Sequence, residues 1–319
     1  MPKVSVIIPI YKVEDYIERC LHSLFLQTLD DIEYIFVNDA SPDSSFIILK
    51  DILNLYPNRL SQVKIINHKQ NLGVAAARSS GIKSATGEYI IHCDPDDFVE
   101  IDIYEKLYSK ALETDADIIT CDHYRISESN KIIQNIYYLS NPQDCLANWY
   151  NKKRGGNYSM LWDKLIRRKI IEENNIYPYE NINYGEDFGC VVRFFYYSKS
   201  IASVHLPLYH YCKREDSYTL SPLTIKIFES RINLVNKVCE LLVDQKYKSF
   251  SLNLKFNMKL SGRKVLNDNE KTWFDLYRET HRHILSFKDN SIKARILWFI
   301  ALSNFNIYKF LKRNLTVIN

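Results

Sequence analysis

Within its first hundred residues the chain alternates short apolar runs with longer amphipathic segments. The apolar runs are rich in Ile, Val and Tyr, which favour strands, and they are apolar on both faces. Strands that alternate with helices form a parallel sheet covered by helices on both sides. The sequence therefore predicts an α/β, Rossmann-like, mostly parallel sheet, with strands at 4–8, 33–37, 63–67 and 89–93 and helices at 15–26, 44–55 and 74–85.

The rest of the chain predicts a continuation of this sheet and then a helical region. After Pro222 the pattern changes to long helical periodicity with few Gly or Pro residues, so we expect a boundary there. Residues 1–221 form the first predicted domain, which divides after the fourth strand into halves at 1–97 and 98–221. Residues 222–319 form the second. The further elements expected in the first domain are strands at 117–122, 201–204 and 209–212, a hairpin arm at 132–138, and helices at 162–172 and 186–197.

Bulk composition excludes several classes of protein. The net charge of +4 is too mild to imply a nucleic-acid partner, and no nucleic-acid-binding motif is present. The seven cysteines are scattered singly, which is typical of reduced intracellular thiols. The N-terminus does not resemble a signal peptide, and no apolar stretch reaches the ~18 residues of a membrane span. We therefore expect a cytoplasmic protein.

The last predicted helix, 292–311, mixes aromatic and aliphatic residues with lysines and arginines. Such helices can lie on anionic membrane surfaces, here the inner face of the cell membrane. The commoner outcome for an apolar stripe is packing on the first domain or on a second copy in a homo-oligomer. The sequence leaves both open.

Chemistry is concentrated after the strands, because ligands of such sheets bind beyond the carboxyl ends of the strands. The strand at 89–93 is followed by Asp94, Asp96 and Asp97. Carboxylate oxygens are the ligands that Mg²⁺ or Mn²⁺ prefers, and both ions commonly share their shell with phosphates. An Asp- and Pro-rich turn is the alternative explanation.

Other strand ends carry candidate nucleotide contacts. Asp39 lies where a carboxylate could accept a hydrogen bond from a uracil imide, and Arg78 follows the third strand, where it could face a phosphate or a base carbonyl. Pro9 and Tyr11 leave the first strand as an extended segment on which a base could lie flat. Alternatively, Asp39 caps a turn and Arg78 pairs with a surface acid.

In their order and spacing these segments resemble the inverting family 2 glycosyltransferases, which have the GT-A fold. The resemblance runs from VSVIIPIYK through VNDASPDSS and NLGVAAARSSGIKSATGEYIIHCDPDDF to YGEDFGCVVRFF. It implies that the residue at Asp39 binds uracil, that Arg78 helps to hold the nucleotide, and that Asp94 lies near the ribose while Asp96 binds the metal. It also places Pro9, Tyr11 and Asn71 in the nucleotide pocket, and it implies that 1–97 is the nucleotide-sugar half of the first domain and 98–221 the acceptor half.

Glu186 and Asp187 open the predicted helix 186–197, where acids could simply complement the helix N-terminus. The resemblance instead implies that Asp187 is the general base, and we assign Glu186 to orienting the acceptor or the neighbouring Asp187. A sugar hydroxyl is a poor nucleophile until its proton is removed, so a positioned carboxylate is needed. Asp187 would deprotonate the acceptor, which attacks the anomeric carbon opposite the departing diphosphate in one inverting step.

A later segment, YHYCKREDS, also resembles the family. There His210 could complete the metal shell with Asp94 and Asp96, although a lone histidine in a strand is more often structural. Arg214 and Ser217 could meet the diphosphate. Trp162 and Lys164 resemble a motif that faces the acceptor, although Trp162 could equally pack in the core.

The resemblance implies transfer of one hexose or N-acetylhexosamine from a UDP-sugar to a glycan or lipid-linked acceptor, in bacterial surface polysaccharide synthesis. The QxxRW motif of processive synthases is absent, and Asn38 and Ala40 replace the Asp and Gly of many relatives. A non-catalytic nucleotide-sugar-binding protein is one alternative. A sugar nucleotidyltransferase is another, but the loop after the first strand lacks the glycine that would let its backbone approach phosphates.

Overall fold

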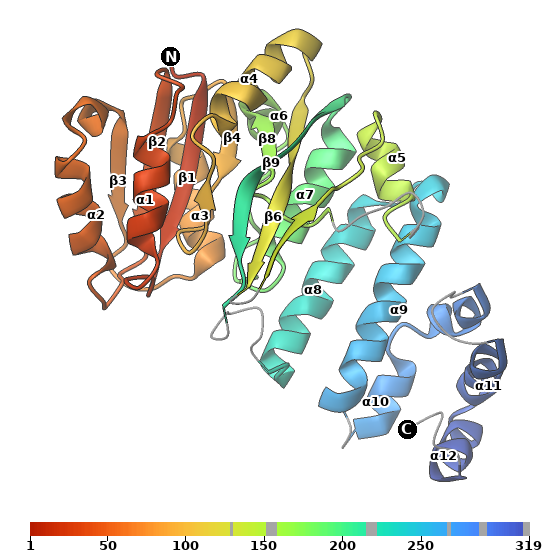
Figure 1. Ribbon diagram of the computed structural model, residues 1–319. Helices are drawn as coiled ribbons and strands as arrows, with labels where there is room; N and C mark the ends of the chain where they lie inside the picture. The colour runs from red at the N-terminus through yellow and green to blue at the C-terminus, as the bar shows by residue number, and fades with distance from the viewer. Residues whose placement is uncertain (128–129, 151–157, 215–221, 267–268, 287–291, 315–319) are drawn as a thin grey trace. The chain divides into compact units, whose positions relative to one another are not determined.

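The computed structural model describes residues 1–127, 130–150, 158–214, 222–266, 269–286 and 292–314 of the 319-residue chain. The backbone divides into two compact units, Met1–Ser221 and Pro222–Asn319. Figure 1 shows the first unit as a sheet with helices and the second as helices alone.

The N-terminal half of the first unit is a parallel sheet. Strand β1 (Val4–Ile10) lies between β2 (Ile32–Asn38) and β4 (Tyr89–His92), and β3 (Val63–Asn67) extends the sheet beyond β2. All three pairings are parallel, so the carboxyl ends of the four strands meet at one edge. The four strands predicted from sequence are present, with ends shifted by at most two residues.

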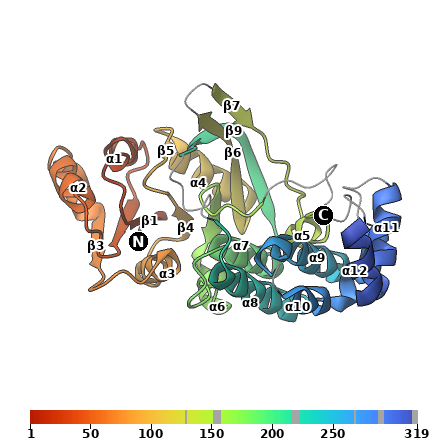
Figure 2. The ribbon, with the colours of Figure 1, turned by 90° about the horizontal axis from the view of Figure 1, so that it is seen from below.

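Helices cover both faces of this sheet because β1 is apolar on both faces. Val4, Val6 and Ile8 belong to a core formed with α1 (Ile17–Phe25) and α4 (Ile103–Thr114). Ile7 points the other way, toward α3 (Val74–Ser84), where a Cβ on Gly81 would lie 2.4 Å from its Cγ2. Only glycine permits this close approach. Figure 2 shows α1 and α4 on one side of the sheet and α3 on the other. Helix α2 (Ser45–Asn54) and a 3-10 turn, η1 (Pro57–Gln62), connect β2 to β3.

Beyond β4 the sheet becomes mixed. The order of its strands in the described residues is β3-β2-β1-β4-β8-β6-β9-β5, with β7 paired to β6. Strands β6 and β9 are parallel, whereas β8 is antiparallel to both β4 and β6. The added strands are β5 (Phe98–Val99), β6 (Ile118–Ser127), β7 (Asn130–Gln134), β8 (Lys164–Arg167) and β9 (Ile201–Cys212), and the helices are α5 (Pro142–Ala147), α6 (Arg168–Glu173) and α7 (Glu186–Tyr197).

Two sequence predictions in this half are wrong. The helix expected at 162–172 is strand β8 followed by the short helix α6. Its residues are buried between β4 and β6, so they give no amphipathic pattern that distinguishes a strand from a helix. The two strands expected at 201–204 and 209–212 are one strand, β9, because its pairing with β6 shifts register near Pro207 and so accommodates the proline.

The second unit is helical, as predicted. Its helices are α8 (Ile225–Leu241), α9 (Lys248–Val265), α10 (Glu270–Asp275), α11 (Ile292–Ser303) and α12 (Phe305–Asn314), with 3-10 turns η3 (Gln245–Tyr247) and η5 (Arg278–Ser286). Aromatic residues from several of these helices pack into one core, including Phe256, Trp273, Trp298 and Tyr308. None of the helices within the described ranges has the length and apolar character needed to cross a membrane.

A buried lysine forms hydrogen bonds between two helices of this unit. Lys259 on α9 has no exposed surface, and its Nζ donates to the carbonyl oxygens of Trp273, Phe274 and Leu276 at 2.6–2.8 Å. These carbonyls lie at the C-terminus of α10, where they have no partner within the helix. The Lys259 side chain therefore caps α10 from a neighbouring helix, and burial lowers the pKa of Lys259 to about 7.

Candidate active site

The centre of the site is the guanidinium of Arg78, which is 5% exposed. Its Nη2 donates to Asp94 Oδ1 at 2.9 Å, and its Nε donates to Glu186 Oε1 at 3.4 Å. Burial opposes the charge on Arg78, but the carboxylates of Asp94 and Glu186 outweigh burial and raise its pKa. One arginine thus ties the end of β4 to the start of α7, two segments far apart in the sequence.

The two acids that open α7 lie beside this arginine. Gly185, with φ of 86°, turns the chain into the helix, a backbone conformation that favours glycine. Burial, reinforced by the neighbouring Asp187, raises the pKa of Glu186 to about 8. Burial also raises the pKa of Asp187, and Arg78 partly opposes that shift. At neutral pH Glu186 therefore holds a proton, and Arg78 favours the ionised form of Asp187.

The three aspartates after β4 have different environments. Asp97 is buried and fixed, because Tyr209 Oη donates to one of its oxygens and the Cys212 backbone N–H to the other, both at 2.7 Å. Asp94 and Asp96 are partly exposed and remain accessible to a ligand. Burial, followed by the Asp94 carboxylate, raises the pKa of Asp96 to about 6, with Arg214 opposing the shift.

Asp94 and Asp96 are the pair best suited to a divalent cation. They are hard oxygen donors whose mutual repulsion such an ion would relieve. Among the described residues no group of three or more His, Cys, Asp or Glu side chains is arranged to hold a metal. The two carboxylates fit a metal that takes its remaining ligands from water and a diphosphate, which is the usual arrangement for Mg²⁺ in phosphate sites.

His210 does not join these carboxylates. Its ring is stacked between Phe98 and Tyr124, with centroids 4.1 and 4.7 Å away, and its Nε2 lies 2.8 Å from Glu100 Oε1. Adjacent residues of a strand point to opposite faces, and Tyr209 is the neighbour that reaches Asp97. His210 is accordingly left out of the metal site proposed below.

Arg214, a predicted diphosphate contact, lies beside the Asp96 carboxylate. Its Nη1 is 3.3 Å from Asp96 Oδ2, and its guanidinium lies 4.4 Å from the centre of the Tyr16 ring. Arg19 reaches the same segment, donating from Nη2 to the Asp96 carbonyl oxygen at 3.2 Å. Ser217, the other predicted diphosphate contact, is outside the described residues.

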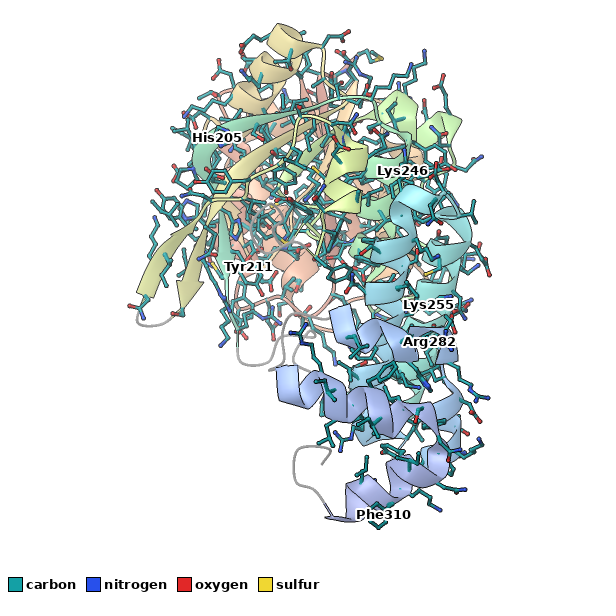
Figure 3. All side chains as sticks on the ribbon, turned by 90° about the vertical axis from the view of Figure 1, so that its right-hand side faces the viewer. His205, Tyr211, Lys246, Lys255, Arg282 and Phe310 are labelled. Carbon is teal, nitrogen blue, oxygen red and sulfur yellow. The ribbon has the colours of Figure 1, made fainter. Side chains whose placement is uncertain are left out.

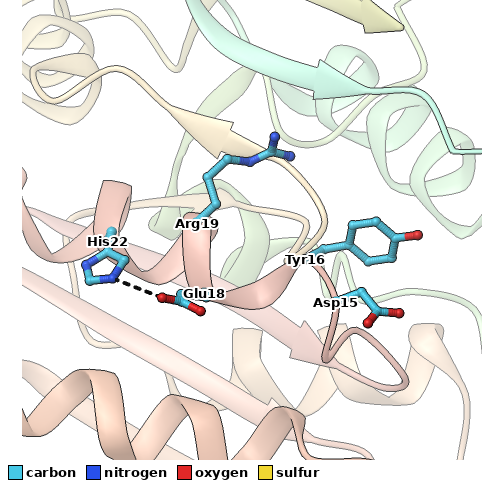
Figure 4. A pocket seen from close by; sticks show the side chains of 5 residues that line it. All are labelled: Asp15, Tyr16, Glu18, Arg19 and His22. Carbon is cyan, nitrogen blue, oxygen red and sulfur yellow. Dashed lines mark ion pairs between the residues drawn. The ribbon is translucent and has the colours of Figure 1, made fainter. Parts of the chain in front are cut away.

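A hollow of about 550 Å³ adjoins this corner of the site. It is lined by Asp15, Tyr16, Glu18, Arg19 and His22, all at or near the start of α1. Figure 4 shows Arg19 and Tyr16 on the side of the helix that faces the end of β9. Arg19 is therefore shared between the hollow and the Asp96 segment.

At the end of β2, Asp39 is 2% exposed and accepts several hydrogen bonds. The backbone N–H groups of Leu72 and Gly73 donate to its two oxygens at 2.9 and 2.8 Å, and His68 Nδ1 lies 2.6 Å from Oδ1. A carboxylate has about four acceptor sites, and these three contacts use all but one of them. Asp39 thus fixes the loop before α3, with its side chain almost fully buried.

The remaining predicted nucleotide contacts surround Asp39. Pro9 is buried inside β1, paired with Val37, so the strand runs two residues further than expected. Tyr11 is 40% exposed. Asn71 is exposed and donates from Nδ2 to the Asp39 carbonyl oxygen at 3.4 Å. The structure therefore brings these residues to one edge of the sheet.

Trp162 and Lys164 are part of the core. Trp162 is 5% exposed and stacks on Tyr209, with centroids 4.2 Å apart. Lys164 and Asp163 form a fully buried ion pair at 2.7 Å. Of the two alternatives that the sequence left open for Trp162, the structure shows packing in the core, and Lys164 is buried with it.

Sequence reasoning missed several residues that shape the site. His68 contacts Asp39, and His92 Nδ1 lies 3.4 Å from Arg78 Nη1. Both are polar residues in or directly after a predicted strand, which was a usable signal. Tyr209 and Arg19 gave no such signal, because their partners are remote in the sequence.

Residues 5–175 match the family described as Glycosyl transferase family 2. The chain belongs to glycosyl transferase family 2. This family 2 chain is 32% identical over 236 residues to the uncharacterized glycosyltransferase EpsJ of Bacillus subtilis (strain 168), covering 70% of the chain and 64% of EpsJ. It is 30% identical over 220 residues to the poly(ribitol-phosphate) beta-glucosyltransferase of Bacillus spizizenii, covering 68% of the chain and 33% of that enzyme. The chain thus spans less than two thirds of either relative.

Solved structures share the fold. Residues 1–349 of S. aureus TarS in complex with UDP-GlcNAc superpose with a TM-score of 0.67 at 19% identity, covering 98% of this family 2 chain and 90% of the other. The mannosyltransferase PcManGT of Pyrobaculum calidifontis, in complex with GDP-Man and Mn²⁺, gives 0.56 at 14% identity, covering 98% and 87%. The prediction of a GT-A fold with C-terminal helices is confirmed.

Proposed function

We propose that this family 2 chain transfers one hexose or N-acetylhexosamine from a UDP-sugar to a glycan or lipid-linked acceptor, with inversion at the anomeric carbon. The observation that carries the proposal is the bridge from Asp94 through Arg78 to Glu186. It joins the end of β4, which is suited to binding a nucleotide, to the start of α7, which is suited to a general base. A protein that only binds a nucleotide does not need acids at the start of α7.

Asp187 is the proposed general base. It lies at the N-terminus of α7, where Arg78 favours its ionised form and burial raises its pKa. A buried carboxylate is a stronger base than one in water, which suits removal of a hydroxyl proton. Glu186, protonated at neutral pH, donates a hydrogen bond that orients the acceptor. A single base is sufficient because the displacement inverts the anomeric centre in one step.

The donor is held by residues from four strand ends. In our proposal Asp39 accepts from the uracil imide, while Pro9, Tyr11 and Asn71 line the base pocket. Arg78 and Asp94 position the nucleotide, and Arg214 meets the diphosphate. Asp96 and Asp94 would bind Mn²⁺ or Mg²⁺, which supplies positive charge that stabilises the departing diphosphate.

The proposed reaction can be tested by measuring nucleotide binding and UDP release separately. UDP with Mn²⁺ raises the melting temperature of the wild-type protein, because a ligand that binds the native state stabilises it. Release of UDP from UDP-sugars, screened donor by donor, is then abolished in Asp187→Asn while the UDP-induced shift remains. Asp51→Asn, an exposed acid on α2, is the matched control and keeps full activity.

The same experiment separates the competing functions. A non-catalytic nucleotide-sugar-binding protein would show the thermal shift with no UDP release from any donor. A sugar nucleotidyltransferase would instead form pyrophosphate from a nucleoside triphosphate and a sugar phosphate. Either result would refute the transferase proposal.

We further propose that the product is a bacterial surface polysaccharide, made from a cytoplasmic donor pool. The similarity to an enzyme named for poly(ribitol-phosphate) supports the first part. The second is supported by the seven free cysteines, five of them buried, which suit a reducing compartment.

A further inference from the structure

The two units of the chain carry formal charges of opposite sign, although the net charge of the whole chain is small. Residues 222–319 hold 18 Lys and Arg against 8 Asp and Glu, a formal charge of +10. Residues 1–221 hold 24 against 30, a charge of −6. A field of one sign on one unit indicates a partner of opposite charge for that unit. Lys246, Lys255 and Arg282 in Figure 3 belong to this basic unit.

The last 30 residues, 290–319, are the extreme case. They contain Lys293, Arg295, Lys309, Lys312 and Arg313 and no acidic residue. This segment includes α11 and α12 and is continuous with the aromatic core of the unit.

Helices α11 and α12 also present large apolar side chains outward. Trp298, Ala301 and Leu302 are the buried face of α11, and Ile296 and Ile300, on its opposite face, are 49% and 45% exposed. On α12, Tyr308 is buried, whereas Ile307 and Phe310 are 40% and 65% exposed. Figure 3 shows Phe310 pointing outward from its helix. Each helix therefore buries one face and leaves a second apolar face to solvent.

We propose that α11 and α12 form a docking surface for an anionic lipid membrane, with the side chains of Ile296, Ile300, Ile307 and Phe310 entering the interfacial layer. Lys309, which precedes Phe310 in the sequence, is exposed and adds a positive charge to the same helix. A helix binds to such an interface through two features: apolar side chains that enter the lipid and basic side chains that are attracted to anionic headgroups. The inference does not depend on the sugar transferred or on the proposed chemistry.

The lengths of the helices determine the mode of binding. Helix α11 has 12 residues and α12 has 10. Twelve residues rise about 18 Å, short of the ~30 Å of a hydrocarbon core, so each helix would lie in the plane of the interface.

Two other occupants fit less well. A second copy in a symmetric dimer would place this basic segment against itself. Glu270 pairs with Lys312, but 290–319 holds no acid to neutralise the other basic residues. A soluble polyanion such as a phosphate-containing glycan would pair with the lysines but would leave the four apolar side chains in water. A membrane satisfies both the charge and the apolar surface.

The test is flotation of the full-length protein with vesicles of phosphatidylcholine, with and without phosphatidylglycerol. Wild type binds the anionic vesicles and not the neutral ones, and added salt weakens binding because it screens the charge. In Ile307→Ser/Phe310→Ser the partition coefficient falls about tenfold or more, as expected when two apolar side chains no longer enter the interface. Leu112→Ser/Ile133→Ser is the matched control, since those side chains are 65% and 50% exposed on the other unit, and it binds like wild type.

Each contrary outcome overturns the proposal. Equal binding by the two double variants, with unchanged melting temperatures, would show that the apolar faces do not touch lipid. Binding to soluble polyphosphate without binding to vesicles would assign the basic unit to a polyanion. A wild-type dimer that becomes a monomer in Ile307→Ser/Phe310→Ser, by light scattering, would assign the surface to a second copy.

Discussion

Replacement of Glu186 by glutamine tests the electrostatics of the site directly. The side chain is 7% exposed, and its Oε1 accepts from Arg78 Nε at 3.4 Å. Glutamine keeps this acceptor and the shape of the side chain but cannot ionise. Any difference in pH dependence between the two proteins therefore reports the titration of this carboxyl.

The size of the effect follows from the pKa of Glu186, which burial and Asp187 raise from 4.5 to about 8. Between these values the folded state keeps the proton that the unfolded state has released, so rising pH destabilises the fold. Each unit of pKa difference corresponds to about 1.4 kcal/mol, so we expect a loss of about 3–5 kcal/mol across this range. The loss is absent from Glu186→Gln.

Urea unfolding of both proteins between about pH 5 and pH 8, at fixed ionic strength, measures this difference. The free energy of unfolding of wild type falls more steeply with pH than that of Glu186→Gln, and the two curves diverge above pH 5. Glu113→Gln, an exposed acid on α4, is the control and parallels wild type. Parallel curves for Glu186→Gln and wild type would refute the conclusion that Glu186 is protonated at neutral pH.

Three further substitutions probe other parts of the fold. Ala40 has φ of 53°, a strained conformation for a residue with a Cβ, so Ala40→Gly stabilises the protein by up to about 1 kcal/mol in urea unfolding. Arg78→Met leaves the Asp94 carboxylate without its cation and Glu186 Oε1 without its donor, which costs about 3–5 kcal/mol by the same measurement and abolishes UDP release. Lys259→Met leaves three carbonyl oxygens without a donor, at a cost of about 1–3 kcal/mol for each, and limited proteolysis should then cut the C-terminal unit first.

The parallel half of the sheet could be predicted from the sequence because each of its strands and helices has a local pattern of apolar residues. Strands β1 to β4 are apolar on both faces and are separated by amphipathic helices, so periodicity located them within two residues. The same logic placed Asp39, Asp94 and Asp96 at one edge, because the carboxyl ends of parallel strands coincide.

The partners of these residues required the tertiary structure. That Arg78 joins Asp94 to Glu186, and that Tyr209 rather than His210 supports the aspartate loop, depends on packing between segments more than 90 residues apart. Strand β8 was missed because full burial removes the periodicity that distinguishes strand from helix. The sequence by itself determined which residue types stand at the strand ends, since each follows from local pattern. Only the tertiary structure decided which of them are ionised, paired or buried, because a charge inside a protein is set by neighbours brought from elsewhere in the chain.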